Sequence, residues 1–592
     1  MFFQNRDGLN EQICVAQNEF LNENSKTKSL FDAEAIIKKS VEGKQNFDLH
    51  NFDECLRFRL DHKDHGLING KYCVIAFNST TETKLKYTAV CYPDSCSDIS
   101  LQHVSKGFFD DTQYTMHQQW CQTTHLEYKL SDYMAFIFFA LLALIVIIST
   151  FYDYYKRHSD NKKAWLTTFS LYSNVKRVFR TSASDDMNCL YALRVLSIFW
   201  LIIANRFYTM QKFPLTDEET FNEWLQNGFS AFISAYDVAY DTFFMVSGFI
   251  LATYCLKAYA SKSMNYIHLL LHRYFRYVPL LAAAIIYYVS ILKFTVTGPM
   301  VYRLTKRIEN CQNYWWTTIL LVENYVSPDH VCLYDGWYFN VDFQFFIILP
   351  LLVYIFFKFR KVGTVLLYTI LIGVYTTVIT LLILYDTPYD VINQVSALPI
   401  HSHFRCAPWI ISIYLANLCL KKELKFKKST RILCWIATSA IFVAHFVTAY
   451  ILQNENYVSD SIIIGAIFAG VHRIFWALAI SWIIIVCIKL ETDSVVKKIL
   501  NSSKWKPLGK LTVTMLIVHP LYQIATTYSL KSSYDFSPWW TFHAGLGDIV
   551  FTTFLAIILY GSIEIPFVTM EKAFHWKKKQ VEIEAVQIEK VI

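Results

Sequence analysis

The stretch that most constrains this chain runs from Met187 to Tyr208 and reads MNCLYALRVLSIFWLIIANRFY. It is long enough and apolar enough to cross a bilayer. It nevertheless carries Arg194 inside the apolar run and an Asn205–Arg206 pair at its far end. Eleven helical residues separate Arg194 from Asn205 by about 16 Å, roughly half the hydrocarbon thickness. Because an arginine within the membrane is costly, we interpret this stretch as part of a functional site buried among other helices.

The composition indicates a membrane protein with many spans. The chain has 592 residues, of which 54% are hydrophobic and only 17% are charged, whereas a soluble domain has about 25% charged residues. The formal net charge is +7, but lysine and arginine cluster in short loops between apolar stretches. This pattern is typical of cytosolic loops rather than of a nucleic-acid-binding surface. We therefore expect the lipid bilayer as a partner and no nucleic acid.

The apolar stretches predict an all-α polytopic membrane protein with about eleven transmembrane helices. Basic residues between Lys156 and Lys163 follow the first stretch and place its carboxyl end in the cytosol. Residues 1–130 then form a small extracytoplasmic domain, residues 131–186 the first helix and a cytosolic linker, and residues 576–592 a cytosolic tail. The predicted spans are residues 133–151, 187–208, 231–256, 277–294, 339–357, 362–384, 405–420, 432–452, 462–490, 511–529 and 546–570.

Six of the fourteen cysteines precede the first span, at Cys14, Cys55, Cys73, Cys91, Cys96 and Cys121. Their spacing does not repeat in the paired form of a zinc site, so disulfides are favoured over zinc and an oxidising compartment is indicated. Six cysteines allow fifteen pairings. Proximity in the sequence predicts Cys91 with Cys96, Cys55 with Cys73, and Cys14 with Cys121. A further disulfide is predicted between Cys311 and Cys332, and no metal site is expected.

The start of the chain carries two signals of location. Asn78-Ser79-Thr80 is a glycosylation sequon, which is usable only outside the cytosol and is otherwise a chance match. The first residues lack the charged-then-apolar pattern of a signal peptide. Either the first span exports the domain, or a leader is missing from this sequence. Both the plasma membrane and the endoplasmic reticulum fit these signals.

Polar side chains recur within or at the ends of the predicted spans. In a bilayer such groups turn inward and find partners, so we expect many of them to share one interior cavity. Taken singly, each is equally well explained by a structural hydrogen bond between helices or by an end residue that reaches the interface. They are Arg194, Asp237, Asp241, His272, Arg273, Arg276, Asp342, Gln344, His401, His403, Arg405, His445, His472, Arg473 and His519.

Three local patterns suggest binding roles. Arg273 and Arg276 lie three residues apart and share a helix face, where they are placed to hold phosphates of an anionic co-substrate or to anchor the cytosolic end of the helix. Ser247, followed by a glycine, permits two helices to approach closely. Asp342 and Gln344 begin a span and are placed to hold a hydroxyl-bearing substrate.

An ordered series of motifs resembles the nose-resistant-to-fluoxetine group of the membrane acyltransferase-3 family. The cysteine motifs FDECL, GKYCV and CYPDSCSDIS resemble the lumenal domain of that group. The match covers nearly the whole chain, and residues 187–575 correspond to the family's ten-helix core, with one helix before it. The membrane motifs are LRVLSIFW (193–200), DTFFMVSGFIL (241–251), HRYFRYVP (272–279), GWYFNVDFQFF (336–346), HRIFWALAISW (472–482), LGKLTVTMLIVHP (508–520) and EIPFVTMEK (564–572).

The resemblance implies transfer of an acyl group from cytosolic acyl-CoA to a hydroxyl of a lipid or other lumenal acceptor, with acyl-CoA as a co-substrate and no bound cofactor. In the family, the helix at residues 187–208 carries an arginine and, eleven residues later, a histidine proposed as general base. Arg194 matches the arginine, but Asn205 occupies the histidine position. Together with the polar residues of the spans, the three local patterns give the candidate substrate or acyl-CoA contacts, which are Asp241, Ser247, His272, Arg273, Arg276, Asp342, Gln344, Arg405 and Arg473.

The departure at Asn205 leaves two hypotheses. An asparagine amide does not take up a proton near neutral pH and cannot replace imidazole as a base, although it can hydrogen-bond a substrate. In an active acyltransferase, His519 is the best stand-in by residue type. Alternatively, the protein is a non-catalytic relative that binds or moves lipid or another hydrophobic molecule. A secondary transporter would show inverted repeats or broken helices, and no convincing pair of half-chains is present.

Overall fold

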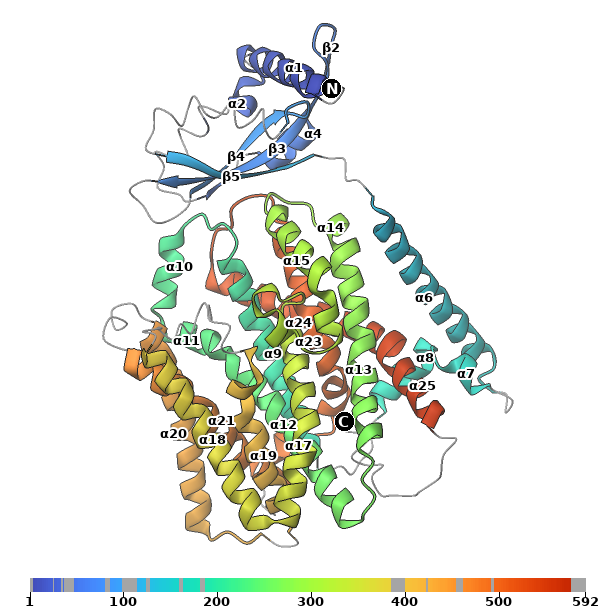
Figure 1. The fold of residues 1–592 in the computed structure, drawn as a ribbon, viewed down its shortest axis with the longest axis vertical. Helices are drawn as coiled ribbons and strands as arrows, with labels where there is room; N and C mark the ends of the chain where they lie inside the picture. Colours follow the sequence, from blue (N-terminus) through green and yellow to red (C-terminus); the bar gives the residue numbers. More distant parts are fainter. Residues whose placement is uncertain are drawn as a thin grey trace.

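The computed structural model places a small N-terminal domain at one end of a large helical bundle (Figure 1). This agrees with the predicted polytopic fold with a disulfide-rich N-terminal domain. The predicted tail at residues 576–592 lies outside the described part of the chain. The structure describes residues 4–24, 26–32, 36, 47–49, 51–79, 86–97, 114–123, 128–158, 163–180, 187–384, 400–421, 424–453, 462–490 and 494–575.

The N-terminal domain packs short helices on a five-stranded sheet. The long strand β3 pairs antiparallel with β4 along one edge and with β2 and β5 along the other, while β1 pairs parallel with β4. Gly66 begins β3 with φ of +70°, a conformation that glycine adopts without a steric cost. The elements are α1 (Gln4–Glu23), α2 (Lys28–Phe31), β1 (Phe47–Asp48), α4 (Phe52–Arg57), β2 (Arg59–His62), β3 (Gly66–Ser79), β4 (Lys86–Pro93) and β5 (Tyr114–Gln122).

The six N-terminal cysteines form three disulfides, Cys14–Cys96, Cys55–Cys91 and Cys73–Cys121. The disulfide framework is therefore confirmed, but the three pairings predicted from proximity are wrong. The sheet register explains the difference, because Cys73 on β3 lies directly opposite Cys121 on β5. The helices α1 and α4 bring the other two partners from distant parts of the sequence onto the sheet.

Two further predictions on cysteine and asparagine residues have different outcomes. The Cys311–Cys332 disulfide is present and confirms the prediction for that loop. Asn78 and Ser79 lie in β3, but their side chains and Thr80 are outside the described part of the chain. Glycosylation at Asn78 therefore stays a prediction.

The bundle contains long helices joined by short ones. Two π-helical turns, η2 and η7, interrupt the long helices that contain them. The elements are α6 (Leu130–Tyr155), α7 (Ala164–Thr167), α8 (Leu171–Phe179), α9 (Asn188–Gln211), α10 (Glu218–Leu225), α11 (Gly228–Ser234), η1 (Ala235–Asp237), α12 (Val238–Ala260), α13 (Tyr266–Ile286), η2 (Tyr287–Ile291), α14 (Leu292–Thr295), α15 (Val301–Ile319), α16 (Glu323–Val326), η3 (Pro328–His330), α17 (Gly336–Lys358), α18 (Arg360–Leu384), η5 (Ser402–Arg405), α19 (Cys406–Cys419), α20 (Lys428–Gln453), α21 (Ile462–Ile488), α22 (Val495–Leu500), α23 (Trp505–Tyr528), α24 (Pro538–Leu559), η7 (Tyr560–Glu564) and α25 (Ile565–His575).

Nine helices in the described part of the chain are long and apolar enough to cross a membrane. The other two predicted spans correspond to α19, which has only 14 residues, and to α23, which has 24 residues but a more polar sequence. Both are enclosed by neighbours, α19 by α12 and α21, and α23 by α9 and α24. A helix that faces protein rather than lipid does not need the length or apolarity that hydropathy detects.

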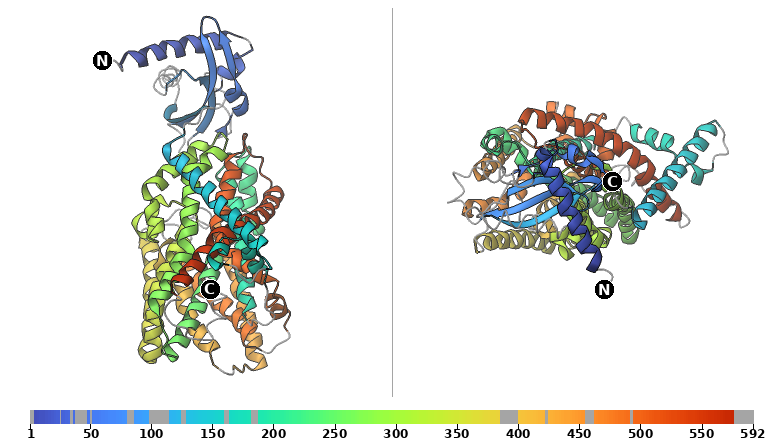
Figure 2. Two further views of the ribbon diagram at one scale, coloured as in Figure 1. Left: turned by 90° about the vertical axis from the view of Figure 1, so that its right-hand side faces the viewer. Right: turned by 90° about the horizontal axis from the view of Figure 1, so that it is seen from above.

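The helix α9 forms the centre of the bundle. It packs against α12, α23 and α24. In its most apolar 18-residue stretch 78% of the residues are buried, against 11% in the corresponding stretch of α6. Figure 2 shows α6 at the edge of the molecule, where its apolar side chains face outward. The stretch from Met187 to Tyr208 is therefore surrounded by protein, whereas α6 leaves most of its apolar side chains exposed.

Close helix packing at Gly248 follows the prediction from the Ser247-Gly248 pair. A Cβ atom at Gly248 would lie 2.5 Å from the hydroxyl oxygen of Ser412 and 3.1 Å from the ring of Trp409. Only glycine lets α12 and α19 approach to this distance. The close approach holds α12, which carries several buried charges, against the rest of the bundle.

The disulfide connectivity is testable by mass mapping of non-reduced peptides. We expect the linkages Cys14–Cys96, Cys55–Cys91 and Cys73–Cys121. Replacing both Cys55 and Cys91 with serine removes the link between α4 and β4 and should destabilise the N-terminal domain by about 2–5 kcal/mol. The control is Cys434→Ser, a free cysteine in α20. A peptide that links Cys91 to Cys96 would contradict the fold of this domain.

Candidate active site

The two polar residues that drew attention to α9 share one face of the helix. Eleven residues at 100° each leave them about 20° apart around the axis. Both are buried, with 5% of Arg194 and 2% of Asn205 exposed. The face therefore runs from Arg194 near one end of the helix to Asn205 near the other, and it points into the bundle.

Asn205 contacts His519, which lies on α23 and is fully buried. The Asn205 Nδ2 atom lies 2.9 Å from His519 Nε2, and His519 Nδ1 lies 3.0 Å from the carbonyl oxygen of Met515. A carbonyl only accepts, so Nδ1 carries the hydrogen and Nε2 presents a lone pair to the Asn205 amide. The Asn205 Oδ1 atom has no hydrogen-bond partner in the described part of the chain.

Asp335 completes this group, and sequence reasoning missed it. Its Oδ2 atom lies 3.3 Å from His519 Nε2, and its Oδ1 atom accepts a hydrogen bond of 2.9 Å from the Tyr240 hydroxyl. Asp335 directly precedes the span α17. Burial raises the pKa of its carboxyl to about 7, although the hydrogen bond from Tyr240 acts in the opposite direction. Asp335 therefore takes up a proton at a higher pH than an exposed aspartate does.

A cavity of about 20 Å³ adjoins this group, large enough for a water molecule or a small polar group. Asn205 forms part of its wall. The cavity makes the interior face of α9 accessible to a small reacting group. The remaining lining residues are Tyr208, Thr209, Lys212, Arg307, Tyr334, Pro520, Gln523, Ile524 and Tyr528.

Arg194, at the other end of the same face, lacks a carboxylate partner among the described residues. Its Nε atom is buried without a hydrogen bond in that part of the chain. Its charge interacts with two other arginines and two tyrosines, which are Arg273, Arg276, Tyr277 and Tyr338. A buried cation without a carboxylate favours an anionic ligand or a polarised carbonyl.

Arg273, unlike Arg194, forms an ion pair with a carboxylate. Its Nη2 atom lies 2.6 Å from Asp342 Oδ2 and 2.7 Å from the Ser247 hydroxyl oxygen. The Tyr277 hydroxyl donates to the same carboxylate oxygen over 2.9 Å. The structure therefore brings together three residues predicted as ligand contacts, Arg273, Asp342 and Ser247, as a polar cluster between α12, α13 and α17. The Asp342 Oδ1 atom has no hydrogen bond within the described residues.

The other basic residues of α13 pair with the end of the chain. Arg276 Nε lies 2.9 Å from Glu564 Oε1, and Thr514 donates to the other oxygen over 2.7 Å. His272 Nδ1 lies 3.0 Å from Glu571. Glu564 and Glu571 were not predicted, although both fall in the motif EIPFVTMEK. The carboxylates hold η7 and α25 against α13.

Four residues form a closed square of charges away from Asn205. Arg405 contacts Asp237 at 2.5 Å and Asp241 at 3.2 Å, and Arg473 contacts both carboxylates at 2.6 Å. Arg405 also lies 4.9 Å from the centre of the Trp337 ring. The ion pairs of Asp241, Arg405 and Arg473 join α12, η5 and α21, and substrate contact at these residues stays a prediction.

Gln344 lies in a further hydrogen-bond network at the start of α17. Its side-chain nitrogen donates to the Leu321 carbonyl over 3.0 Å and to Asn324 over 2.7 Å, and the Ser402 hydroxyl donates to its oxygen. These bonds fix the loop before α17. They do not bring Gln344 to His519, so Gln344 lies in a hydrogen-bond network of its own.

Arg206, next to Asn205, anchors α9 to α24. It forms a bidentate pair with Asp548 at 2.7 and 2.6 Å and donates to Thr526 and Thr527 at 2.9 Å. Gln523 of α23 donates to the same carboxylate over 2.8 Å. This network fixes the rotation of α9 and α23, and therefore the contact between Asn205 and His519.

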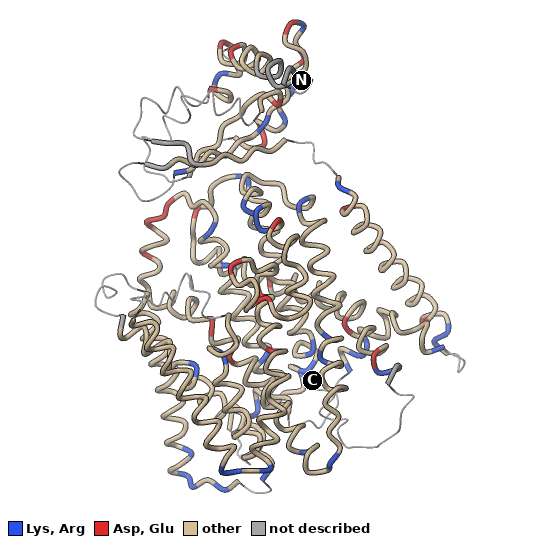
Figure 3. The backbone as a smooth tube through the Cα atoms, in the orientation of Figure 1, with Lys and Arg blue, Asp and Glu red and all other residues tan. Residues whose placement is uncertain are grey.

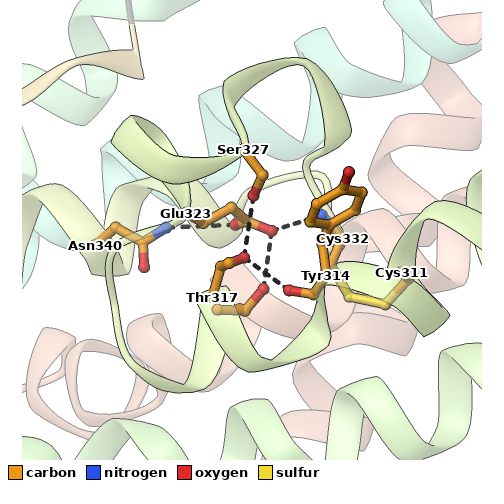
Figure 4. Close-up of a disulfide and its surroundings, with 8 residues drawn as sticks. Cys311, Tyr314, Thr317, Glu323, Ser327, Cys332 and Asn340 are labelled. Atoms are coloured by element: carbon orange, nitrogen blue, oxygen red, sulfur yellow. Dashed lines mark hydrogen bonds between the residues drawn. A yellow bond between two sulfur atoms is a disulfide. The ribbon is translucent and has the colours of Figure 1, made fainter.

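Glu323 is a buried carboxylate beside the Cys311–Cys332 disulfide (Figure 4). It accepts hydrogen bonds from the Thr318 hydroxyl at 2.8 Å, the Cys332 amide at 2.6 Å and the Asn340 side chain at 3.3 Å. Burial raises the pKa of Glu323 to about 7 against the lowering effect of these bonds. The sequence showed the cysteines here but gave no signal for the carboxylate.

These features define a multi-pass membrane protein with a polar site enclosed by its helices. The family model of the acyltransferase-3 acyltransferase domain matches residues 187–561. The chain therefore belongs to the acyltransferase-3 family, as its motifs predicted. The match covers the helices that carry Arg194, Asn205, Asp335 and His519.

One curated relative matches over most of the chain. Nose resistant to fluoxetine protein 6 of Caenorhabditis elegans is 24% identical over 548 residues, which cover 82% of this chain. The match spans 64% of the length of that relative. No solved structure matches this chain significantly.

The charge square should contribute strongly to stability. Asp237→Asn removes one carboxylate and leaves Arg405 and Arg473 with a single buried partner. We expect a loss of about 3–5 kcal/mol in the free energy of unfolding, measured by thermal unfolding in detergent. Asp329→Asn, at an exposed position in η3, is the matched control and should change little. An unchanged unfolding temperature for Asp237→Asn would show that the square is not structural.

The raised pKa of Glu323 predicts a pH dependence of stability. Between its ordinary value of 4.5 and about 7, the folded protein holds a proton that the unfolded chain releases. Stability from this group is complete below pH 4.5 and falls as the pH rises to 7, by roughly 3 kcal/mol. Glu323→Gln should abolish this contribution, and Glu309→Gln should not. A constant difference between wild type and Glu323→Gln across this pH range would contradict the assignment.

Proposed function

We propose that this protein transfers an acyl group from acyl-CoA to a hydroxyl of an acceptor, with His519 as the general base. The observation that carries the proposal is the 2.9 Å contact between Asn205 and His519. Asn205 occupies the position where the family is expected to have its base, and its amide donates to the Nε2 lone pair of an imidazole that lies directly against it. The base is then supplied from α23 instead of α9.

The proposed chemistry uses each member of the site. The acceptor hydroxyl replaces the Asn205 amide at His519 Nε2 and gives its proton to that nitrogen. The hydroxyl oxygen attacks the thioester carbonyl, the carbon–sulfur bond breaks, and the thiol of coenzyme A leaves with the proton that His519 has held. The Asn205 amide, once displaced, donates toward the developing negative charge. Ionised Asp335, 3.3 Å from the same nitrogen, stabilises the imidazolium by its opposite charge.

Arg194 has a separate role in this proposal. It lies about 16 Å along α9 from Asn205 and lacks a carboxylate partner among the described residues. We assign it to the phosphate or carbonyl groups of the acyl-CoA arm. The co-substrate then extends along the polar face of α9 and brings its thioester to His519.

We also propose an orientation in the membrane. The three disulfides of the N-terminal domain favour an oxidising compartment. The domain therefore faces the lumen or the exterior, and the C-terminus faces the cytosol, in the plasma membrane or the endoplasmic reticulum. Arg194 then lies toward the cytosolic supply of acyl-CoA, and Asn205 lies toward the acceptor side.

A second function is favoured by the same contact. The Asn205 amide occupies the only lone pair of His519 that faces the site, and this arrangement fits a relative that has lost catalysis and binds or moves lipid. The two functions differ in one respect. An active enzyme uses His519 without change, whereas the non-catalytic relative needs a histidine at position 205 to act.

Acyl transfer is testable with purified protein in nanodiscs, by release of free coenzyme A from acetyl-CoA and palmitoyl-CoA in the presence of membrane lipid. We expect His519→Gln to lower kcat/KM by about 10²–10⁴, because the base is lost. His543→Gln, at an exposed position of α24, is the control. Arg194→Gln should raise KM for acyl-CoA.

Two outcomes decide between the functions. Wild-type turnover by His519→Gln would eliminate His519 as the base. No turnover by the wild type together with turnover by Asn205→His would establish the non-catalytic relative.

A further inference from the structure

A large cleft separates the N-terminal sheet from the end of the bundle. Its volume is about 650 Å³, in the range of small-molecule sites. The sheet contributes Ala76, Tyr87, Gln118 and Trp120 to its wall, and the bundle contributes residues from the ends of α9, α15 and α23 and from α10. Figure 1 shows the sheet facing α15 and α10 across this region.

The cleft has a fixed shape because several contacts hold the domain on the bundle. The rings of Trp120 and Tyr302 stack with centroids 4.2 Å apart. The Gln122 side chain donates to the Gly298 carbonyl over 3.2 Å, and Lys531 pairs with Asp53 at 2.6 Å. The walls of the cleft therefore belong to one assembled structure.

The bundle side of the cleft is strongly basic. Lys212, Arg303, Lys306 and Arg307 line it, and Glu218 is the one acidic residue among its described lining residues. Lys212, Lys306 and Arg307 make no ion pair with a carboxylate within the described ranges. Figure 3 shows Lys and Arg gathered on the bundle end beneath the N-terminal domain.

Lys212 lies where the cleft meets the cavity beside Asn205. Its ammonium group donates to the Tyr208 hydroxyl and lies 3.9 Å from the centre of the Tyr208 ring. Burial, together with Arg307 and Arg303, lowers the pKa of Lys212 to about 7. An anion that binds among crowded cations reduces the repulsion between them, so this cluster favours an anionic ligand.

The cleft leads to the candidate active site. Lys212, Arg307 and Tyr528 line both the 650 Å³ cleft and the 20 Å³ cavity beside Asn205. A molecule held by its charged group at these cations therefore has its neighbouring atoms directed toward Asn205 and His519.

We propose that this cleft binds the phosphate group of the acceptor, so that the acceptor is a phosphate-bearing hydroxyl compound. The inference rests on the proposed function and names the substrate class of that site. Arginine and lysine together suit a phosphate, because guanidinium groups bind its oxygens in pairs and ammonium groups add charge. The phosphate belongs either to a lipid head group or to a soluble ester.

Binding is measured with full-length protein in detergent and two fluorescent probes of equal chain length, a lysophosphatidic acid and an uncharged monoacylglycerol. We expect the double variant Lys306→Gln/Arg307→Gln to lose at least tenfold in affinity for the phosphorylated probe and little for the uncharged one. Arg360→Gln/Lys361→Gln is the matched control, with an equivalent pair of charges at an exposed site on α18. Competition by glycerol 3-phosphate indicates a soluble ester, and competition by the lipid alone indicates a head group.

The outcomes separate this inference from the proposed function. Equal affinity of wild type and double variant for the phosphorylated probe overturns the cleft assignment, even if acyl transfer is observed. A selective loss of affinity in the double variant supports it, even if no acyl transfer is found. The unfolding temperature of each variant is measured as well. If the double variant does not fold, the single variant Lys306→Gln replaces it, because Lys306 is exposed. We again expect a lower affinity for the phosphorylated probe.

Discussion

Buried charges must be paired, and this requirement organises the bundle. An unpaired charge in an apolar interior costs several kcal/mol, so each buried arginine needs a carboxylate on another helix. Arg206 with Asp548, Arg273 with Asp342, and Arg276 with Glu564 join segments that are between 69 and 342 residues apart in the sequence. These pairs fix how the helices are rotated around α9, and packing then fills the remaining space.

Against this background, Arg194 differs from the paired arginines of the spans, and Asn205 lies on the same helix face. The cations in the square of Asp237, Asp241, Arg405 and Arg473 are satisfied by carboxylates. Arg194 has no such carboxylate among the described residues, and the Asn205 oxygen there has no hydrogen bond. Arg194 and Asn205 lie on one face of one helix, although other buried polar atoms, such as Asp342 Oδ1, also lack a hydrogen bond within the described residues. Unsatisfied polarity in a protein interior indicates a place where a ligand binds or reacts.

The sequence predicted the parts of the structure that depend on local pattern. Apolar length identified the spans, and the grouping of cysteines identified a disulfide domain. Arg194, Asn205 and His519 were also recognised, because a polar residue in an apolar run is visible without a fold. The prediction failed where a partner is chosen in three dimensions. Cys91 pairs with Cys55 rather than with nearby Cys96, because the helix α4 packs on the sheet.

The same limit applies to the site. Asp335 precedes its span and looks like an ordinary loop carboxylate, and only the fold, in which α17 packs against α12, places it 3.3 Å from His519 of α23. The ion pairs of Asp241, Arg405 and Arg473 were not predicted either, because sequence shows that a charge is in a span but not what neutralises it. The short α19 and polar α23 differed from ordinary spans for a related reason, since protein rather than lipid surrounds them.

The central claim is that the imidazole of His519 takes the proton of the acceptor hydroxyl. Its most direct test is transfer of a radiolabelled acyl group by His519→Ala, measured with and without added imidazole. Removal of the side chain leaves a space of the shape of the missing ring. The account predicts that transfer is lost and that imidazole restores part of it. Transfer at the wild-type rate by His519→Ala without imidazole would contradict the account.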